Sequence, residues 1–200
     1  MRLILVRHGE TDSNVAKALD TGFPGSPLNE RGVAQAHALV DALAAEPIDA
    51  LFSSDLPRAR QTVAPLAAAR GLAPVALPGF REIFAGEENM SLNWQPYIDM
   101  MFAWVDDPSF ALPGAESFTA FQSRWQDAIE EVERSGARCP LVVSHGAALR
   151  IWVPWAAANI TAEDASAWPL PNTTVIVLEG SSKQGWRLTS WGGSGFVDIA

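Results

Sequence analysis

Two histidine–glycine pairs follow short apolar runs in this sequence. His8-Gly9 comes after the run Leu3–Val6 and directly after Arg7, and His145-Gly146 comes after the run Leu141–Val143. Apolar runs of this length predict buried strands, and open α/β sheets bind ligands beyond the carboxyl ends of such strands. One histidine at a strand end is usually a partly buried structural residue. Two in equivalent positions favour a chemical role.

Arginines near these histidines could bind an anion. The guanidinium of Arg7 offers a planar fork of donors that suits phosphate. Arg58 falls in the first turn of a predicted helix, where its charge and the free backbone N–H groups could face the same anion. Without the histidines nearby in the predicted fold, Arg58 would be interpreted as a solvated surface residue. Arg60 is the alternative phosphate ligand and is ranked below Arg58. Glu82 adds a carboxylate at the same edge of the sheet.

Apolar runs alternate with segments of helical period, which predicts an α/β domain with a largely parallel sheet. The 200 residues form a single domain (1–200), and flexibility is expected only in the tail at 192–195. The expected strands are Arg2–Val6, Asp49–Ser53, Pro74–Leu77, Leu141–Ser144, Thr173–Leu178 and Trp186–Ser190. The expected helices are Glu30–Ala45, Pro57–Arg70, Ser117–Arg134 and Gly146–Ala158.

A lid-like insertion at about 82–116 interrupts this alternation. It is rich in aromatic residues and acids, and no Lys or Arg lies between Arg81 and Arg124. A long connection of this kind is often a lid or binding segment, and a helical excursion that packs on the core is nearly as common. Its apolar patch could also contact a second copy of the chain, so a homodimer is a possible partner state.

The charge of the chain argues against some partners. Its 23 acidic and 14 basic residues give a formal net charge of -9, which disfavours nucleic acid and anionic membrane surfaces. Neither a signal peptide nor a spanning helix fits the sequence, so the expected compartment is the cytoplasm. The single cysteine, Cys139, excludes an intrachain disulfide and a thiolate metal cluster.

Taken together, these segments resemble the histidine phosphatase superfamily, in the branch of cofactor-dependent phosphoglycerate mutase and its small phosphatase relatives. The resemblance covers most of the chain and implies a three-layer α-β-α sandwich. The motifs that carry it, in the order of the family, are Leu5-Val6-Arg7-His8-Gly9-Glu10-Thr11 with Asn14, Pro27-Leu28-Asn29-Glu30-Arg31-Gly32, Ser53-Ser54-Asp55-Leu56-Pro57-Arg58-Ala59-Arg60, Glu82 with Gly86, Gly114-Ala115-Glu116-Ser117, and Val143-Ser144-His145-Gly146.

The resemblance implies a catalytic mechanism without metal or cofactor. His8 would attack the phosphorus of a phosphomonoester and form a phosphohistidine, and Glu82 would serve as general acid and then as general base. The products would be an alcohol and inorganic phosphate. The residues implied to surround the phosphoryl group are Arg7, Asn14, Arg58 and His145. Further substrate contacts are implied for Gly146, Gly25 and Ser26, with Glu116 and Ser117 near the pocket.

The preferred function is hydrolysis of a small phosphorylated metabolite. A mutase would need extra cations for a phosphoglycerate carboxylate, and the insertion supplies only acids such as Asp99 and Asp106. A phospho-ligand scaffold would not need both His8 and Glu82, and a metallohydrolase would place two arginines beside its cation. After Glu82 the chain reads Ala85-Gly86-Glu87-Glu88, where many relatives continue toward Trp-Glu-Gly, so the substrate, and whether it is a metabolite or a phosphoprotein, stays open.

Overall fold

A mixed sheet of six strands forms the centre of the molecule, with the strand order β3-β2-β4-β1-β5-β6. The computed structural model describes residues 1–192. β4 pairs parallel with both β1 and β2, and β2 also pairs parallel with β3. β5 instead pairs antiparallel with both β1 and β6. Within the described residues only β5 therefore runs against the other strands. The strands are β1 Arg2–Arg7, β2 Ala50–Ser53, β3 Val75–Ala76, β4 Pro140–Ser144, β5 Val175–Ser181 and β6 Gly185–Gly192.

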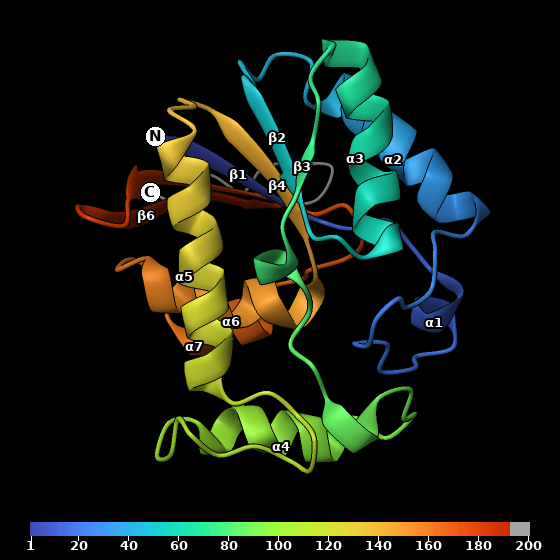
Figure 1. Ribbon diagram of the computed structural model, residues 1–200, viewed down its shortest axis with the longest axis vertical. Helices are drawn as coiled ribbons and strands as arrows, with labels where there is room; N and C mark the ends of the chain where they lie inside the picture. The colour runs from blue at the N-terminus through green and yellow to red at the C-terminus, as the bar shows by residue number, and fades with distance from the viewer. Residues whose placement is uncertain (193–200) are drawn as a thin grey trace.

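Helices cover both faces of this sheet. Side chains alternate along each strand, so Leu3 and Leu5 of β1 enter one apolar core while Ile4 and Val6 enter another. α2 and α3 lie side by side over the second core, and α5 and α6 cover the first (Figure 1). The predicted three-layer α-β-α sandwich is confirmed. The helices are α1 Asp12–Val15, α2 Glu30–Ala42, α3 Pro57–Arg70, α4 Gln95–Ala103, α5 Phe118–Arg134, α6 Gly146–Ala156 and α7 Ala162–Ala167, with short 3-10 helices η1 Pro78–Phe80 and η2 Gly86–Glu88.

Most predicted elements occur within a few residues of their expected bounds, and the differences have local causes. α2 ends at Ala42 rather than Ala45, and its Val33 is 45% exposed instead of facing the core. The short helices α1 and α7 were not expected, and α4 agrees with the alternative of a helical excursion in the insertion that packs on the core. Gly192 of the expected flexible tail ends β6, and residues 193–195 lie outside the described residues.

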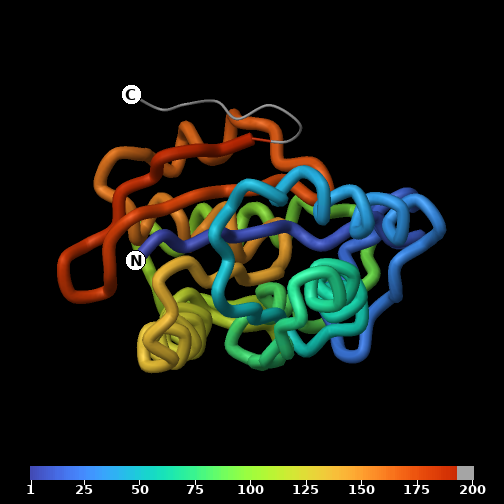
Figure 2. The backbone as a smooth tube through the Cα atoms, turned by 90° about the horizontal axis from the view of Figure 1, so that it is seen from above, coloured from blue at the N-terminus to red at the C-terminus, as the bar shows by residue number. Residues whose placement is uncertain are grey.

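The sheet order brings the two histidine segments together. β1 and β4 are parallel neighbours in which Arg7 pairs with Ser144, and the backbone N–H of His8 donates to the Ser144 carbonyl (2.9 Å). Both strands therefore end at the same edge, with His8 and His145 in corresponding positions. Figure 2 shows β1 in dark blue running through the middle of the molecule, with the red β5–β6 hairpin on one side.

The insertion at 82–116 leaves the body and returns at the same place. The N–H of Glu116 donates to the Phe84 carbonyl (2.9 Å), and the N–H of Glu87 donates to the Pro113 carbonyl (3.1 Å). Between these ends α4 buries Tyr97 and lies below α5 at the bottom of Figure 1. In residues 1–192 no helix is both long and apolar enough to cross a membrane.

Candidate active site

A cavity of about 770 Å³ opens beside His8 and is called here the His8 cavity. Strand ends, α6 and the insertion all contribute to its walls. Its polar lining is His8, Arg7, Asn14, Asp20, Thr21, Arg58, Glu82, Arg150 and Ser166. Its larger apolar lining residues are Leu19, Trp94, Tyr97, Ile98, Met101, Phe102, Trp104, Val105, Phe118, Ile151, Trp155 and Leu170.

His8 carries its proton on a defined ring nitrogen. Its Nδ1 lies 2.7 Å from the Gly9 carbonyl oxygen, and because a carbonyl can only accept, Nδ1–H is the donor. Burial, together with the charges of Arg58 and Arg7, lowers the pKa of His8 well below its usual range. The ring is therefore neutral near pH 7, and its Nε2 holds a free lone pair.

His145 has the opposite tautomer. The guanidinium Nε of Arg58 donates to His145 Nδ1 (3.2 Å), so in the neutral ring the proton is on Nε2. Burial and the charge of Arg58 lower the pKa of His145 well below its usual range. The ring is fully buried, 5.1 Å from that of His8, and lies behind the cavity rather than in its lining. The structure thus places His8, whose Nε2 has a free lone pair, next to His145, whose Nε2–H has no acceptor within residues 1–192.

Three buried donors around His8 have no partner within residues 1–192. They are Nε of Arg7, Nη1 of Arg58 and Nε2 of His145. Buried N–H groups are nearly always hydrogen-bonded, and each orphan costs about 1–3 kcal/mol. Donors without acceptors, two of them on cations, are what an anion-binding site requires before its ligand arrives.

Asp20 holds Arg58 in place. Its backbone carbonyl accepts from Arg58 Nη2 (3.0 Å), and its carboxylate, 6% exposed, lies 3.9 Å from Arg58 Nη1. Burial raises the pKa of Asp20, but hydrogen bonds from Ser26 and Ser13 and the charge of Arg58 outweigh this, so the pKa is lowered overall. Asp20 is a site residue that the sequence analysis missed.

Gly25 and Ser26 support this arrangement instead of lining the cavity. Gly25 has a φ of +70° and passes so close to Arg58 Nη1 that a β-carbon there would clash with it. The N–H of Ser26 donates to Asp20 Oδ2 (2.8 Å). The structure therefore brings both residues beside Arg58 but not to the cavity wall.

Asn14 is oriented by a second asparagine. Its Oδ1 accepts from the N–H of Thr11 (3.2 Å) and from Nδ2 of Asn172 (3.0 Å), which leaves the Asn14 amide free to donate at the cavity. Asn172 Nδ2 also donates to the carbonyl of His8 (3.0 Å). The next residue, Thr173, has a φ of 60°, a strained conformation for a β-branched side chain. Asn172 was also missed.

The carboxylate of Glu82 caps the N-terminus of α6 at the cavity wall. Oε1 accepts from the N–H groups of Ala148 (2.7 Å) and Ile83 (3.0 Å), and Oε2 accepts from the N–H of Ala147 (3.0 Å). Negative charge at this end of a helix is stabilised by the helix dipole. Because α6 begins directly after His145, the cap places the carboxylate beside the histidine pair.

Glu116 and Ser117 act at a distance from the cavity. Glu116 forms a bidentate pair with Arg124 (2.6 and 2.7 Å), and Arg124 Nη2 donates to the backbone carbonyl of Glu82 (3.0 Å). Ser117 is the N-cap of α5 and accepts from the N–H of Ala120 (3.3 Å). Neither residue lines the His8 cavity.

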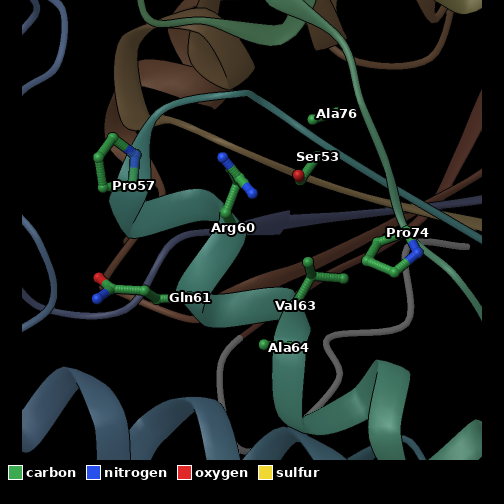
Figure 3. A pocket seen from close by; sticks show the side chains of 8 residues that line it. All are labelled: Ser53, Pro57, Arg60, Gln61, Val63, Ala64, Pro74 and Ala76. Atoms are coloured by element: carbon green, nitrogen blue, oxygen red, sulfur yellow. The ribbon is translucent and has the colours of Figure 1, made fainter.

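Arg60 does not join the site. It is exposed and lines a separate cleft of about 470 Å³ between α3 and β3, as Figure 3 shows. Arg58, two residues earlier, is 2% exposed and faces the His8 cavity. Of the two alternatives from the sequence, the structure brings only Arg58 to His8. The third histidine, His37, is exposed on α2.

The electrostatic argument against a multiply charged substrate was wrong. None of the five acids of the insertion on which it depended lines the cavity. The insertion contributes aromatic and aliphatic side chains instead, and α6 contributes a third cation, Arg150. The signal for Arg150 was present, since it is the one charged residue of α6. The acids are Glu87, Glu88, Asp99, Asp106 and Asp107.

The metal-site hypothesis finds no support in the arrangement. Within residues 1–192 no three His, Cys, Asp or Glu side chains are grouped as a metal ion would require. The oxygens of Glu82 are occupied by backbone N–H groups, and Nδ1 of His145 is occupied by Arg58.

Comparison with known proteins defines the family. The sequence pattern of the histidine phosphatase superfamily (branch 1) matches residues 3–193. The chain belongs to this superfamily. As a member of branch 1, it carries the family's motifs on the strand ends and helices described above, and the resemblance inferred from those motifs is confirmed.

Curated relatives of this histidine phosphatase include hydrolases. The adenosylcobalamin/alpha-ribazole phosphatase of Salmonella typhimurium is 34% identical over 84% of this chain and 84% of its own length. A probable phosphoglycerate mutase of Yersinia pestis is 33% identical over 74% of this chain and 71% of its own. The PE-PGRS family protein PE_PGRS11 of Mycobacterium tuberculosis is 33% identical over 94% of this chain, which spans only 36% of that protein.

A solved structure matches almost the whole chain. A mycobacterial glucosyl-3-phosphoglycerate phosphatase complexed with VO3 has a TM-score of 0.80 and 26% identity, covering 96% of this chain and 98% of its own. Homologues of this histidine phosphatase thus hydrolyse phosphomonoesters, and one binds a phosphate-like oxyanion.

Proposed function

We propose that the protein is a phosphomonoesterase that acts on a small phosphorylated metabolite through a phosphohistidine on His8. One observation carries the proposal: a neutral His8 with Nδ1–H bound and Nε2 free lies among three buried donors that lack partners. The relatives named as phosphatases of small metabolites support the same assignment.

The chemistry proceeds in two steps. In the first, the lone pair of His8 Nε2 forms a bond to phosphorus while the ester P–O bond breaks, and Glu82, in its acid form, gives its proton to the leaving oxygen. The proposed donors to the phosphoryl oxygens are Arg7, Arg58, Asn14 and Nε2–H of His145, which concentrate positive charge where negative charge spreads in the transition state.

In the second step a water oxygen attacks phosphorus and the P–N bond breaks. The Glu82 carboxylate takes the proton from this water, which restores its acid form, and His8 regains its free lone pair. The products are the alcohol and inorganic phosphate. No metal or cofactor takes part in either step. The insertion at 82–116 is proposed to act as a lid that excludes bulk water.

Phosphate release from 4-nitrophenyl phosphate, with a chelator present throughout, tests the proposal. We expect His8→Ala to lower kcat at least about a thousandfold, whereas His37→Ala, which removes the exposed histidine, retains full activity. Quenching wild type with alkali during turnover should trap phosphate on the protein, since phosphohistidine survives alkali. Chelator-sensitive turnover, or equal activity in both variants, would contradict the proposal.

Two further readouts separate the alternatives. Binding of phosphate without turnover by wild type would support the scaffold hypothesis. Transfer of phosphate to an added phosphoglycerate, much faster than to water, would support the mutase hypothesis. Glu82→Gln should slow phenyl phosphate more than 4-nitrophenyl phosphate, because the poorer leaving group depends more on protonation.

A further inference from the structure

Arg150 is a cation at the His8 cavity that the proposed mechanism does not use. It lies on α6 one turn after Gly146 and is the one charged residue of that helix. It is half-buried and lines the cavity together with its helix neighbours Ala147 and Ile151. A charged side chain in an otherwise apolar helix, turned toward a cavity, calls for a physical reason.

Carbonyl groups of the α7 segment hold Arg150 from one side. Its Nη1 donates to the backbone oxygens of Ala165 and Trp168, the second at 3.0 Å. Its Nε and Nη2 have no acceptor within residues 1–192, and no carboxylate of those residues lies within 4.0 Å. The guanidinium is thus anchored by one nitrogen and has two left for a ligand.

Most other partly buried arginines differ in this respect, and Arg70, which the backbone carbonyls of Leu43 and Ala44 hold, does not line the cavity. Arg58 lies beside Asp20, and Arg124 is paired with Glu116. Arg7, like Arg150, has no carboxylate partner among the described residues and is held by a backbone carbonyl, that of Leu170. Within residues 1–192, therefore, the cavity presents two cations that form no ion pair with a carboxylate.

Arg7 and Arg150 are close neighbours. The carbonyls that hold them, those of Leu170 and Trp168, belong to residues only two apart in the chain, and both guanidinium groups line the same cavity. Burial lowers the pKa of Arg7, the charge of Glu82 offsets part of this, and the nearby charge of Arg150 lowers the pKa further. Like charges that are both partly removed from water repel each other, and an anion bound beside Arg150 would relieve this repulsion.

We infer that Arg150 binds a second anionic group, carried by the leaving group of the phosphomonoester. The inference rests on the proposed function, in which Arg7 and Arg58 hold the phosphoryl group. The remaining walls are largely apolar and include the exposed rings of Trp94, Phe102 and Trp155. The substrate class is thus a phosphomonoester whose leaving group combines an apolar body with a carboxylate or a second phosphate.

Aryl phosphates that differ only in charge test this inference. The probes are 3- and 4-carboxyphenyl phosphate, each compared with its carbamoyl counterpart, in which an uncharged amide replaces the carboxylate. We expect wild type to prefer one of the acids through a lower KM. In Arg150→Ala the acid-to-amide ratio of kcat/KM should fall about tenfold or more, and in Arg150→Lys by less.

The design separates specificity from folding and from net charge. Both probes are measured on one sample, so a loss of folded protein cancels in the ratio. Arg60→Ala removes the same charge from the separate cleft and should leave the ratio unchanged. The inference would be overturned if Arg150→Ala left the acid-to-amide ratio of kcat/KM unchanged, because both probes were then affected equally. It would also be overturned if wild type showed no preference for either acid. Failure to hydrolyse any probe would instead contradict the proposed function.

Discussion

At the scale of single residues, the site depends on two histidines that are neutral and have opposite tautomers. His8 donates through Nδ1 to a carbonyl, and His145 accepts through Nδ1 from a guanidinium. One ring can therefore attack phosphorus while the other donates to it. Protonation of His8 would remove the lone pair that the proposed reaction needs, so burial and the arginines protect the nucleophile from acid.

The same burial makes stability depend on pH. Both histidines have a pKa well below 6.5 when folded, and about 6.5 when unfolded. As the pH falls through about 6.5, the unfolded chain binds protons that the folded protein does not, so the free energy of unfolding decreases. Between about pH 7.5 and 5.5 the loss should be on the order of 1 kcal/mol for each histidine.

Urea unfolding at both pH values measures this loss. His145→Asn keeps an acceptor for Arg58 and should lose less stability on acidification than wild type, by an amount on the order of 1 kcal/mol. His37→Asn changes an exposed histidine and should behave like wild type. An identical pH dependence in His145→Asn and wild type would show that His145 is not held neutral.

Asn172 tests how far activity depends on positioning. Its side chain donates hydrogen bonds to Asn14 Oδ1 and to the backbone carbonyl of His8, and Asn172→Ala would remove both. This substitution should lower kcat/KM about tenfold and reduce the free energy of unfolding by about 1–2 kcal/mol. Asn159→Ala is a matched control, since Asn159 also makes two hydrogen bonds, both to Leu188 far from the cavity. Equal kcat/KM values in the two variants would refute a positioning role for Asn172.

Two of the residues missed in the sequence share one property. Asp20 and Asn172 lie in connections, and their roles depend on where backbone carbonyls and neighbouring loops come to rest. Asn172 precedes β5, and only the antiparallel direction of β5 brings its start to the edge where β1 ends. The sequence could predict His8, Arg7 and Arg58, because the end of a strand or the start of a helix places each of them without reference to how the loops are arranged.

At the scale of elements, helix ends do most of the positioning. The N-terminus of α6 holds Glu82, the first turn of α3 carries Arg58, and α5 carries Arg124, which fixes the backbone of Glu82. Three helices that pack on the same sheet thus position Glu82 and Arg58 at the cavity. Changes in one helix end are expected to alter either stability or catalysis according to what that end contacts.

Ser117 separates these two effects. As the N-cap of α5 it satisfies one backbone N–H, so Ser117→Ala should reduce the free energy of unfolding by about 1 kcal/mol. Because Ser117 does not line the cavity, kcat and KM should stay at wild-type values. Thermal unfolding together with steady-state kinetics checks both. A substantial fall in kcat would mean that Ser117 acts on the substrate after all.

Element prediction was reliable where burial is continuous. The strands of the centre are apolar runs, and α5 begins at a capping serine, so both could be located from the sequence. α1 and α7 have four and six residues, too few for a periodic pattern, and α4 lies in a segment whose aromatic residues face both the core and the cavity. Such a segment shows no single apolar stripe.

At the scale of the whole molecule, tryptophans connect the body to the site. Trp125 of α5 packs on Trp152 of α6 (5.6 Å between ring centroids), and Trp152 packs on Trp186 of β6 (6.2 Å). All three are buried. Trp155, one turn further along α6, is 47% exposed and lines the His8 cavity. The same helix therefore anchors the fold on one face and contributes to the cavity on the other.

Two substitutions of one residue type test this division. Trp125→Ala should reduce the free energy of unfolding by about 3–5 kcal/mol, because it leaves a cavity in the core. Trp155→Ala should change stability by less than about 1 kcal/mol but raise KM for aryl phosphates. Denaturant unfolding and kinetics with phenyl phosphate measure these effects. If Trp155→Ala destabilised the protein more than Trp125→Ala, the assignment of Trp125 to the core and of Trp155 to the cavity wall would be contradicted.

The strand order also governs when the protein can gain activity during its synthesis. β4, which carries His145, lies between β1 and β2, so the first 139 residues contain three strands of which β1 has no partner. Long-range pairing of this kind is slow and must wait for the later segment. A growing chain thus carries His8 and Arg58 well before β4 pairs with β1 and brings His145 beside them, so the proposed site cannot assemble until β4 has been made.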